Sequence, residues 1–462
     1  MRNFIIVLVV AVLLAGLAGC EEYVGGFESN PLLPSDATPL KNFVGAELSF
    51  SVFTEGFPAY LSSIWAQQLN GADRQFTTYV TYTVTRDDFN NDWSTAYAGA
   101  LGNLRVVQEK AAALGQLNLK GAAEILEGVH MGNVAALWGD VPFSEAIQPP
   151  NFKPKFDDQL AVYASVQTKL SQGIADFTSN PVPLAQDALT TGGSNTKWVK
   201  LARSAKARYL MHVARSQGYS AAALNAIISE AQQGITAVNG SEDVMTTHGT
   251  VQNQSQNLWY DFMTAARTGY MDANATFVLP MLRARRFDGK SNETGRLSFF
   301  FNAAQNGLNT TTTGAYAINA GYPIFRASET YLLMAEAYVR LGDASNALTA
   351  LNNARTYNNT VFKNTSTAFV ASDFPTTAAL QQAIFNETYL SLMHQIEAFN
   401  FMRRINYAIS YRDSAGVTQT FTPKKGTTFP QRFLYSTTEG NSNPNCPVEP
   451  TDAQFNKTKA NR

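Results

Sequence analysis

Cysteine is almost absent from this chain, which has only Cys20 and Cys446 among its 462 residues. A secreted domain held together by disulfides needs several cysteines in even number, so a disulfide framework is excluded. Cys20 follows small residues at the end of an apolar N-terminal run, a position typical of an acylated cysteine. If Cys20 carries a lipid, Cys446 has no partner in the chain for a disulfide.

Histidine is scarce, and there is no excess of basic residues. The four histidines (His130, His212, His248 and His394) never occur with HxxxH or HxH spacing, so we expect no metal site and no cofactor. Lysine and arginine together number 35, against 36 aspartate and glutamate residues. A nucleic-acid-binding protein typically has an excess of basic residues, and this chain has none, so nucleic acid is excluded as a partner.

No membrane-spanning segment is expected, because the apolar run at the N-terminus is short. Arg2 precedes a stretch from Phe4 to Gly19 of about 16 residues, whereas a spanning helix needs roughly 20. A charged start, an apolar core and small residues predict a secretory signal peptide over residues 1–19. Because Leu17–Cys20 (LAGC) has the pattern of a bacterial lipobox, we expect Cys20 to be lipidated and to become the mature N-terminus.

The segment after the lipidation site lacks the periodicity of a helix or a strand. Glycines and prolines interrupt it at Gly25, Gly26, Pro31, Pro34 and Pro39. Residues 20–44 are therefore predicted to be a flexible, lipidated tether. The apolar content of 45% is enough for a substantial core, and we expect residues 45–462 to form a single helical domain.

Apolar residues recur at helical spacing over much of this domain. Helices are predicted over Trp198–His212, over Ser328–Leu341 with Ser328 as N-cap, and over Phe385–Tyr407. Strand signals are few: residues alternate in Phe76–Val84, and Gly295–Phe301 is the other candidate. These patterns predict a mostly α fold.

Residues 331–354 fit the pattern of a tetratricopeptide unit, with Leu341–Asp343 as the turn between its two helices. The repeat positions are occupied by Ala335, Tyr338, Ala347, Leu351 and Ala354. Two looser helix pairs are Trp93–Leu114 with Lys120–Trp138, and Asp157–Thr178 with Lys197–Gln217. We expect degenerate tetratricopeptide helix pairs, packed against an irregular, loop-rich region that binds ligand.

Several segments, in order along the chain, resemble motifs of the SusD/RagB family, the surface nutrient-binding lipoproteins of Bacteroidetes. Besides the lipobox, these are Trp138–Ala146 (WGDVPFSEA), Pro323–Glu329 (PIFRASE) leading into Leu333–Ala337 (LMAEA), Glu397–Phe399 with Met402–Arg404, and Phe429–Tyr435 (FPQRFLY). Ser436 departs from the pattern, because a proline commonly follows the tyrosine. The loops over residues 68–88 and 243–301 match no family motif.

The resemblance implies a SusD-like fold and a protein that breaks no bond. It would be anchored by its lipid in the outer membrane, and Glu21–Glu22 favours the face toward the cell exterior. It would capture oligosaccharide or polysaccharide and deliver it to a SusC-like TonB-dependent transporter. In some relatives the cargo is peptide, so peptide remains an alternative ligand.

Sugar binding requires an aromatic face beside forked polar side chains, because a pyranose has an apolar C–H face and a rim of hydroxyls. Two segments offer this mixture, 65–82 and 257–270. The candidate ligand-binding residues are Trp65, Asp73, Arg74, Tyr79, Tyr82, Trp259, Tyr260, Arg267 and Tyr270. For each aromatic residue, packing in the core is the alternative role.

Two other functions are consistent with a helical repeat chain. A repeat adaptor would bind only protein and would not depend on the two aromatic segments. A helical glycoside hydrolase would need two carboxylates roughly 5–10 Å apart, and the obvious pairs are Asp87–Asp88 and Asp157–Asp158. Both pairs lie near predicted helix starts, where capping accounts for them without catalysis. We therefore predict a binding protein and no enzyme.

Overall fold

The computed structural model describes residues 37–252 and 254–462. Cys20, the predicted signal peptide and most of the predicted tether lie outside the described residues. Helix α3 (Pro39–Glu55) begins within the last part of that tether, where the Thr38 side chain accepts a hydrogen bond from the Lys41 backbone N–H. The helical body therefore begins before residue 45.

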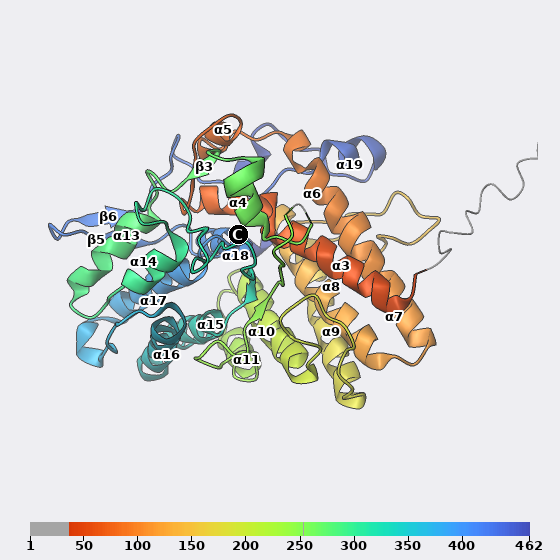
Figure 1. Cartoon of the computed structure of the whole chain (residues 1–462), viewed down its shortest axis with the longest axis horizontal. Helices are drawn as coiled ribbons and strands as arrows, with labels where there is room; N and C mark the ends of the chain where they lie inside the picture. The colour runs from red at the N-terminus through yellow and green to blue at the C-terminus, as the bar shows by residue number, and fades with distance from the viewer. Residues whose placement is uncertain (1–36, 253) are drawn as a thin grey trace, which may run out of the picture.

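Helices make up most of the fold (Figure 1). After α3 the first half contains α4 (Phe57–Trp65), α5 (Phe76–Val80), α6 (Asn90–Ser94), α7 (Gly102–Ala113), α8 (Leu117–Trp138), α9 (Gln159–Ser179), α10 (Asn195–Ala214) and α11 (Ala221–Ala231). The second half contains α12 (Leu258–Asp261), α13 (Val278–Ala284), α14 (Thr294–Phe300), α15 (Ala327–Arg340), α16 (Ala344–Phe362), α17 (Thr377–Ser391), α18 (Ile396–Arg404) and α19 (Thr437–Ser442). Two π-helical segments are η2 (Thr95–Leu101) and η3 (Phe262–Ala266), and the short 3₁₀ turns are η1 (Arg86–Phe89), η4 (Arg285–Asp288), η5 (Ala371–Asp373), η6 (Ala453–Phe455) and η7 (Lys459–Asn461).

The strands of the described chain form short antiparallel pairs. These are β1 (Asn70–Gly71) with β3 (Met271–Asp272), β2 (Val244–Met245) with β4 (Pro323–Phe325), and β5 (Ser410–Arg412) with β6 (Thr418–Thr420). Each pair except β5–β6 joins segments that are far apart in the sequence. They therefore fasten loops to one another and do not build a sheet layer.

Successive long helices pack side by side in chain order, from α7 through α8, α9, α10 and α11, and then on to α15 and α16. The contact between α8 and α9 is close because two glycines face each other. A Cβ atom at Gly173 would lie 2.7 Å from the carbonyl oxygen of Gly121, and one at Gly121 would lie 3.0 Å from that of Gly173. Any larger residue at these positions would force the two backbones apart.

The helix pairs expected from the sequence are present. Helices α7 and α8, then α9 and α10, and finally α15 and α16 follow one another as packed neighbours. The turn between α15 and α16 contains Gly342, whose φ of +82° suits a residue without a Cβ atom. The mostly helical fold is confirmed, whereas the assignment of these pairs to tetratricopeptide units stays a prediction.

Three local predictions were wrong. The segment Phe76–Val84 begins with helix α5 and continues as a turn, and Gly295–Phe301 belongs largely to helix α14. The predicted single helix over Phe385–Tyr407 is two helices, α17 and α18, separated at residues 392–395. The break contains His394, whose φ is +59° and which is completely buried, so contacts with other parts of the chain set this turn.

Among the described residues, no helix combines the length and the apolar character needed to cross a membrane.

Candidate functional site

The two loops with the predicted ligand residues come together, although about 200 residues separate them. Strand β1 pairs with β3, so that Asn70 lies opposite Asp272 and Gly71 opposite Met271. The Ala72 backbone N–H donates to the Tyr270 carbonyl oxygen at 2.8 Å and extends the pairing. Figure 1 places β3 and α5 at the same edge of the molecule, away from helices α9, α10 and α16.

Local sequence makes this pairing possible. The Asn70 amide donates to the Asp272 carboxylate at 3.0 Å, which ties the two strands at their side chains as well. A Cβ atom at Gly71 would lie 1.9 Å from the Phe76 carbonyl oxygen, so only glycine lets the chain turn from β1 into α5. Asp272 was not among the predicted site residues, because no sequence spacing links it to Asn70.

Trp65 and Tyr79, predicted from the first loop, are buried. Trp65 is 0% exposed; its indole N–H donates to the Tyr79 carbonyl oxygen at 3.2 Å, and its ring packs on Phe399 and Phe433. The Tyr79 hydroxyl donates to Asp88 at 2.7 Å. Burial and this hydrogen bond raise the pKa of Tyr79 well above its ordinary value, so its hydroxyl stays a neutral donor. Both side chains are packed in the interior, and neither offers an open face in this structure.

Tyr82 and Trp259 are buried in the same way. The Tyr82 hydroxyl accepts a hydrogen bond from the Lys424 backbone N–H at 2.8 Å. Trp259 is 0% exposed and lies edge-on to Tyr60 and parallel to Tyr322. Its indole N–H has no hydrogen-bond partner among the described residues. In this structure both rings are therefore packed in the core, which was the alternative to ligand contact.

Four of the five remaining predicted residues form an accessible cluster. The guanidinium carbon of Arg74 lies 5.8 Å from the centre of the half-buried Tyr270 ring, and that of Arg267 lies 5.6 Å from it. Both distances are within the range of a cation–π contact. The Arg74 side chain is 69% exposed and pairs with that of Asp73, 57% exposed, at 3.7 Å. We call Asp73, Arg74, Arg267 and Tyr270 the loop cluster.

Short structural elements hold the loop cluster in place. The Asn257 side chain caps α12 by accepting hydrogen bonds from the backbone N–H groups of Trp259 and Tyr260, at 2.9 and 3.0 Å. The π-helical η3 follows directly and ends at Ala266, with Arg267 as its C-cap. Such π-helical turns are rare and frequently occur at functional sites. Tyr260 is half-buried beside this turn.

The arrangement offers exposed forked donors and a carboxylate beside an aromatic ring. The Tyr270 ring packs against Phe76, with ring centres 5.8 Å apart, and against Phe262, with ring centres 6.4 Å apart. Guanidinium and carboxylate groups can form paired hydrogen bonds with neighbouring hydroxyls, while the tyrosine offers apolar surface. The chemistry of the loop cluster is that of binding.

The carboxylate pairs considered for catalysis are engaged in local structure. Asp88 accepts hydrogen bonds from the Thr85 backbone N–H at 2.6 Å and its hydroxyl at 2.9 Å. Asp158 caps α9, accepting from the Leu160 N–H at 2.8 Å. Asp157 accepts from the Ser144 N–H at 2.7 Å. Within the described chain, no group of three or more His, Cys, Asp or Glu side chains is arranged to hold a metal ion.

The family-like motifs have structural roles and contact one another. The Trp138 indole N–H donates to the Leu434 carbonyl oxygen at 2.7 Å, and the Tyr435 hydroxyl donates to the Asp140 carbonyl oxygen at 2.7 Å. Two motifs nearly 300 residues apart thus form one buried junction. Ser436, at the position where proline is common in the family, caps α19 by accepting from the Glu439 N–H at 3.0 Å.

The motif residues Glu397 and Arg403 do not pair with each other. Glu397 binds His212, with Nε2 and Oε1 2.9 Å apart. Arg403 instead donates to the carbonyl oxygens of Gln431 and Ala136, at 2.6 and 2.9 Å. Both side chains are buried, and their partners come from other helices and loops.

A family model described as starch-binding and associating with the outer membrane matches residues 59–436. The chain belongs to this SusD-like family. The family's members are binding proteins and not enzymes, and the family is associated with the outer membrane. No curated protein matches the chain.

Solved structures of SusD-like proteins share its fold. A chitin-binding SusD homolog from Flavobacterium johnsoniae is 16% identical, with a TM-score of 0.67 over 92% of this chain and 98% of that one. A SusD/RagB family protein from Bacteroides thetaiotaomicron is 19% identical, with a TM-score of 0.64 over 89% and 95%. A SusD homolog from Bacteroides fragilis is 15% identical, with a TM-score of 0.66 over 92% and 100%. The resemblance implied by the motifs is confirmed for family and fold.

Proposed function

We propose that this SusD-like protein captures oligosaccharides at the cell surface, through the loop cluster, and delivers them to a SusC-like TonB-dependent transporter. It would be held in the outer membrane by a lipid on Cys20 and would face the cell exterior. The observation that carries the proposal is the convergence of Arg74, Arg267 and Tyr270 at the β1–β3 pairing. Family membership and the chitin-binding relative support a glycan as the ligand.

The structure suggests different roles for the nine candidate residues. The loop cluster would contact the sugar, with Tyr270 as the aromatic surface and Arg74, Arg267 and Asp73 bonding its hydroxyls. Tyr260 would line the edge of the site. The four buried residues would act by supporting these loops; they are Trp65, Tyr79, Tyr82 and Trp259. Direct contact by the buried four would require the loops to rearrange on binding.

The test is calorimetric titration of the purified full chain with maltoheptaose and with chitohexaose, the soluble forms of the two glycans named for the family and its relative. Replacing Tyr270 with alanine should weaken binding of the preferred glycan about tenfold, since an aromatic stacking contact contributes about 1 kcal/mol or more. Tyr338→Ala is the matched control, because Tyr338 is a half-buried tyrosine on α15, outside both loops. Equal affinities for Tyr270→Ala and the unmodified chain would contradict the assignment of the site.

Peptide and protein ligands are separated in the same experiment. An array of glycans and short peptides, probed with the full chain, should give signal on glycans. Binding to peptides alone would favour peptide import by the same kind of complex. No affinity for either class, together with stable association with another protein, would favour the repeat adaptor.

A further inference from the structure

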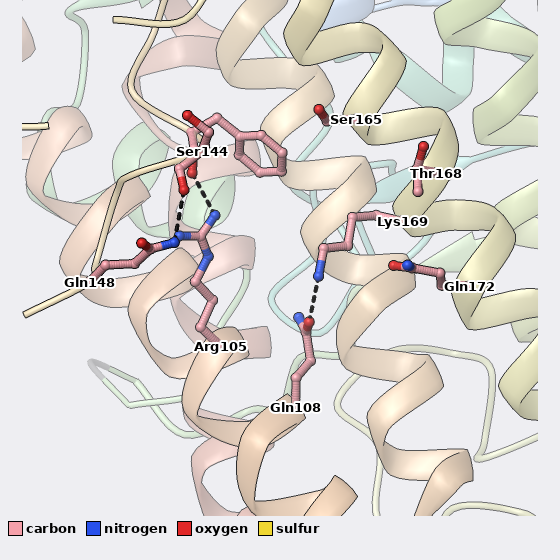
Figure 2. A pocket seen from close by; sticks show the side chains of 9 residues that line it. Arg105, Gln108, Ser144, Gln148, Ser165, Thr168, Lys169 and Gln172 are labelled. Carbon is pink, nitrogen blue, oxygen red and sulfur yellow. Dashed lines mark hydrogen bonds between the residues drawn. The ribbon is translucent and has the colours of Figure 1, made fainter. Parts of the chain in front are cut away.

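A hollow that includes none of the loop-cluster residues lies between helices α7 and α9. It has a volume of about 450 Å³, within the range of small-ligand sites of about 300–1,000 Å³. Figure 2 shows its walls, which come from α7, from α9 and from residues 143–148, at the end of the Trp138–Ala146 motif and just after it. The lining residues used below are Arg105, Ser144, Gln148, Ser165, Lys169 and Gln172. We call it the α7–α9 cavity.

A buried carboxylate with two cationic partners lies behind this wall. Glu127 on α8 is 0% exposed, and it lies 3.4 Å from an Arg105 guanidinium nitrogen and 3.6 Å from Lys169 Nζ. The Gln108 amide donates to the same carboxylate at 2.5 Å. Two positive charges against one negative charge leave the wall with a net positive charge. Charges act strongly on a ligand at such a partly buried surface, because the local dielectric constant is below that of water.

Several polar groups on the wall are free to bind a ligand. Lys169 Nζ has three protons; it donates to Gln108 Oε1 at 2.8 Å and lies near Glu127, which leaves a donor for the cavity. The Gln148 amide nitrogen donates to the Ser144 carbonyl oxygen, so its own oxygen is available. Within residues 37–252 and 254–462, the Ser165 hydroxyl and the Gln172 amide have no hydrogen-bond partner, and both line the cavity.

Asp157, the carboxylate that is hydrogen-bonded to two cavity-lining residues, does not itself line the cavity. Asp157 accepts hydrogen bonds from the backbone N–H groups of Phe143 and Ser144, at 2.9 and 2.7 Å, and from the Ser144 hydroxyl at 2.7 Å. Lys155 Nζ lies 3.8 Å from it. Lys155 Nζ also lies 3.6 Å from Glu145, so the two carboxylates share this lysine. Neither carboxylate lines the cavity, whereas Lys169 and Arg105 do, so an anion inside it would be closest to these two cations.

We propose that the α7–α9 cavity binds an acidic sugar, a hexuronate residue, at a site separate from the loop cluster. The carboxylate of the sugar would pair with Lys169, in the field of Arg105. Its hydroxyls would bond to Ser165, Gln172 and Gln148, which can donate and accept as ring hydroxyls require. A bare inorganic anion would use the cation but would leave this rim of hydroxyl and amide groups unused.

The probe is trigalacturonic acid, titrated by calorimetry into the purified full chain at low and at raised salt. Its methyl ester is the matched ligand, because it keeps the hydroxyls and loses the charge. The acid should bind at least tenfold more tightly than the ester, and the difference should shrink as salt is raised. Equal binding of acid and ester would overturn the proposal.

Replacing Lys169 with methionine should weaken binding of trigalacturonic acid about tenfold. Lys206→Met is the control, since Lys206 is a partly buried lysine that pairs with Glu230, with Nζ and Oε1 2.5 Å apart, outside the cavity. If Lys169→Met fails to fold, the double variant Ser165→Ala/Gln172→Ala removes two unpartnered groups and should also weaken binding. Unchanged affinity in a folded cavity variant would overturn the proposal.

Two further outcomes identify other ligands. Monomeric galacturonate that binds as tightly as the trimer would still support an acidic-sugar site, but one for a free sugar. A hexaglutamate peptide that binds through Lys169 in place of trigalacturonic acid would overturn the sugar assignment and indicate a protein partner. The two proposals fail separately, because Tyr270→Ala tests the loop cluster with neutral glycans and Lys169→Met tests the α7–α9 cavity with the acid.

Discussion

Two completely buried histidines couple the stability of this protein to pH. Burial lowers the pKa of His130 to about 4, although its ring nitrogen is hydrogen-bonded to the Ala96 carbonyl oxygen at 2.9 Å. Burial likewise lowers the pKa of His394 to about 3. In the unfolded chain both would titrate near 6.5. Between pH 6.5 and about 4 these two histidines therefore bind more protons in the unfolded state than in the folded state.

The contribution of these histidines to stability should consequently fall with the pH over that window, whereas buried carboxyls with raised pKa values, such as Glu47 and Asp92, contribute in the opposite direction. For one such histidine, lowering the pH from 6.5 to 5 should reduce the free energy of unfolding by about 2 kcal/mol. His130→Gln, which keeps a donor for Ala96, should reduce this dependence when unfolding by urea is measured from pH 7 to pH 5. His248→Gln is the control, because hydrogen bonding to Glu55 outweighs burial and raises the pKa of His248. A His130→Gln variant as pH-dependent as the unmodified chain would contradict this account.

A second residue-scale prediction concerns a buried ion pair. Arg296 binds Glu293 through two hydrogen bonds of 2.7 Å, and both side chains are buried. Burial raises the pKa of Glu293, but the charges of Arg296 and Arg285 outweigh it and lower this pKa to about 2. Arg296→Met should therefore leave a buried carboxylate undercompensated and destabilise the protein by about 3–5 kcal/mol.

Removing both members of the pair should lower the free energy of unfolding by less than removing the arginine alone. In Arg296→Met/Glu293→Met, Arg285 and Glu387 still pair with each other, with Nη2 and Oε2 2.5 Å apart. Chemical denaturation of the single and double variants measures the coupling directly. Arg412→Met, an exposed arginine on β5, should change stability by less than about 0.5 kcal/mol. If the double variant is no more stable than Arg296→Met, the loss of stability arises from lost packing and not from the undercompensated carboxylate.

At the scale of elements, two helical glycines should respond in opposite directions to the same substitution. Gly173→Ala places a Cβ atom 2.5 Å from an Ile125 side-chain carbon in the α8–α9 contact and should destabilise the protein by about 1–3 kcal/mol. Gly45→Ala on α3 meets nothing within 4 Å and should stabilise it by about 0.5–1 kcal/mol, since alanine favours the helix. Thermal unfolding of both variants measures these effects. Stabilisation by Gly173→Ala would mean that α8 and α9 do not approach closely.

The long helices could be predicted from the sequence, because apolar periodicity and caps are local properties. The strand prediction for segment 76–84 was wrong. Threonine and tyrosine favour strands, but Phe76 and Tyr79 are both buried on one face of a helical turn. The helix break between α17 and α18 could not be foreseen either. It depends on the Gln68 side chain, which accepts a hydrogen bond from the His394 N–H at 2.7 Å across more than 300 residues.

At the scale of the whole molecule, the lipid and the binding site should act independently. Cys20→Ser should move the protein from the membrane fraction to the soluble fraction while its affinity for the preferred glycan stays the same. The reason is that Cys20 precedes the helical body, which begins at α3, and the loop cluster is built from residues far along the chain. Fractionation, and calorimetry on both forms, measure the two effects. A variant that stays with the membrane would contradict lipidation at Cys20.

The sequence by itself determined what local patterns and motifs encode: a lipobox, helices in successive pairs, and motif segments that identified the family. Only the tertiary structure decided which candidate aromatics are buried and which side chains meet. Trp65 is covered by Phe399 and Phe433, and the loop cluster exists because Asn70 meets Asp272, 202 residues further on. Exposure and proximity depend on contacts between distant segments, and no local periodicity records those contacts.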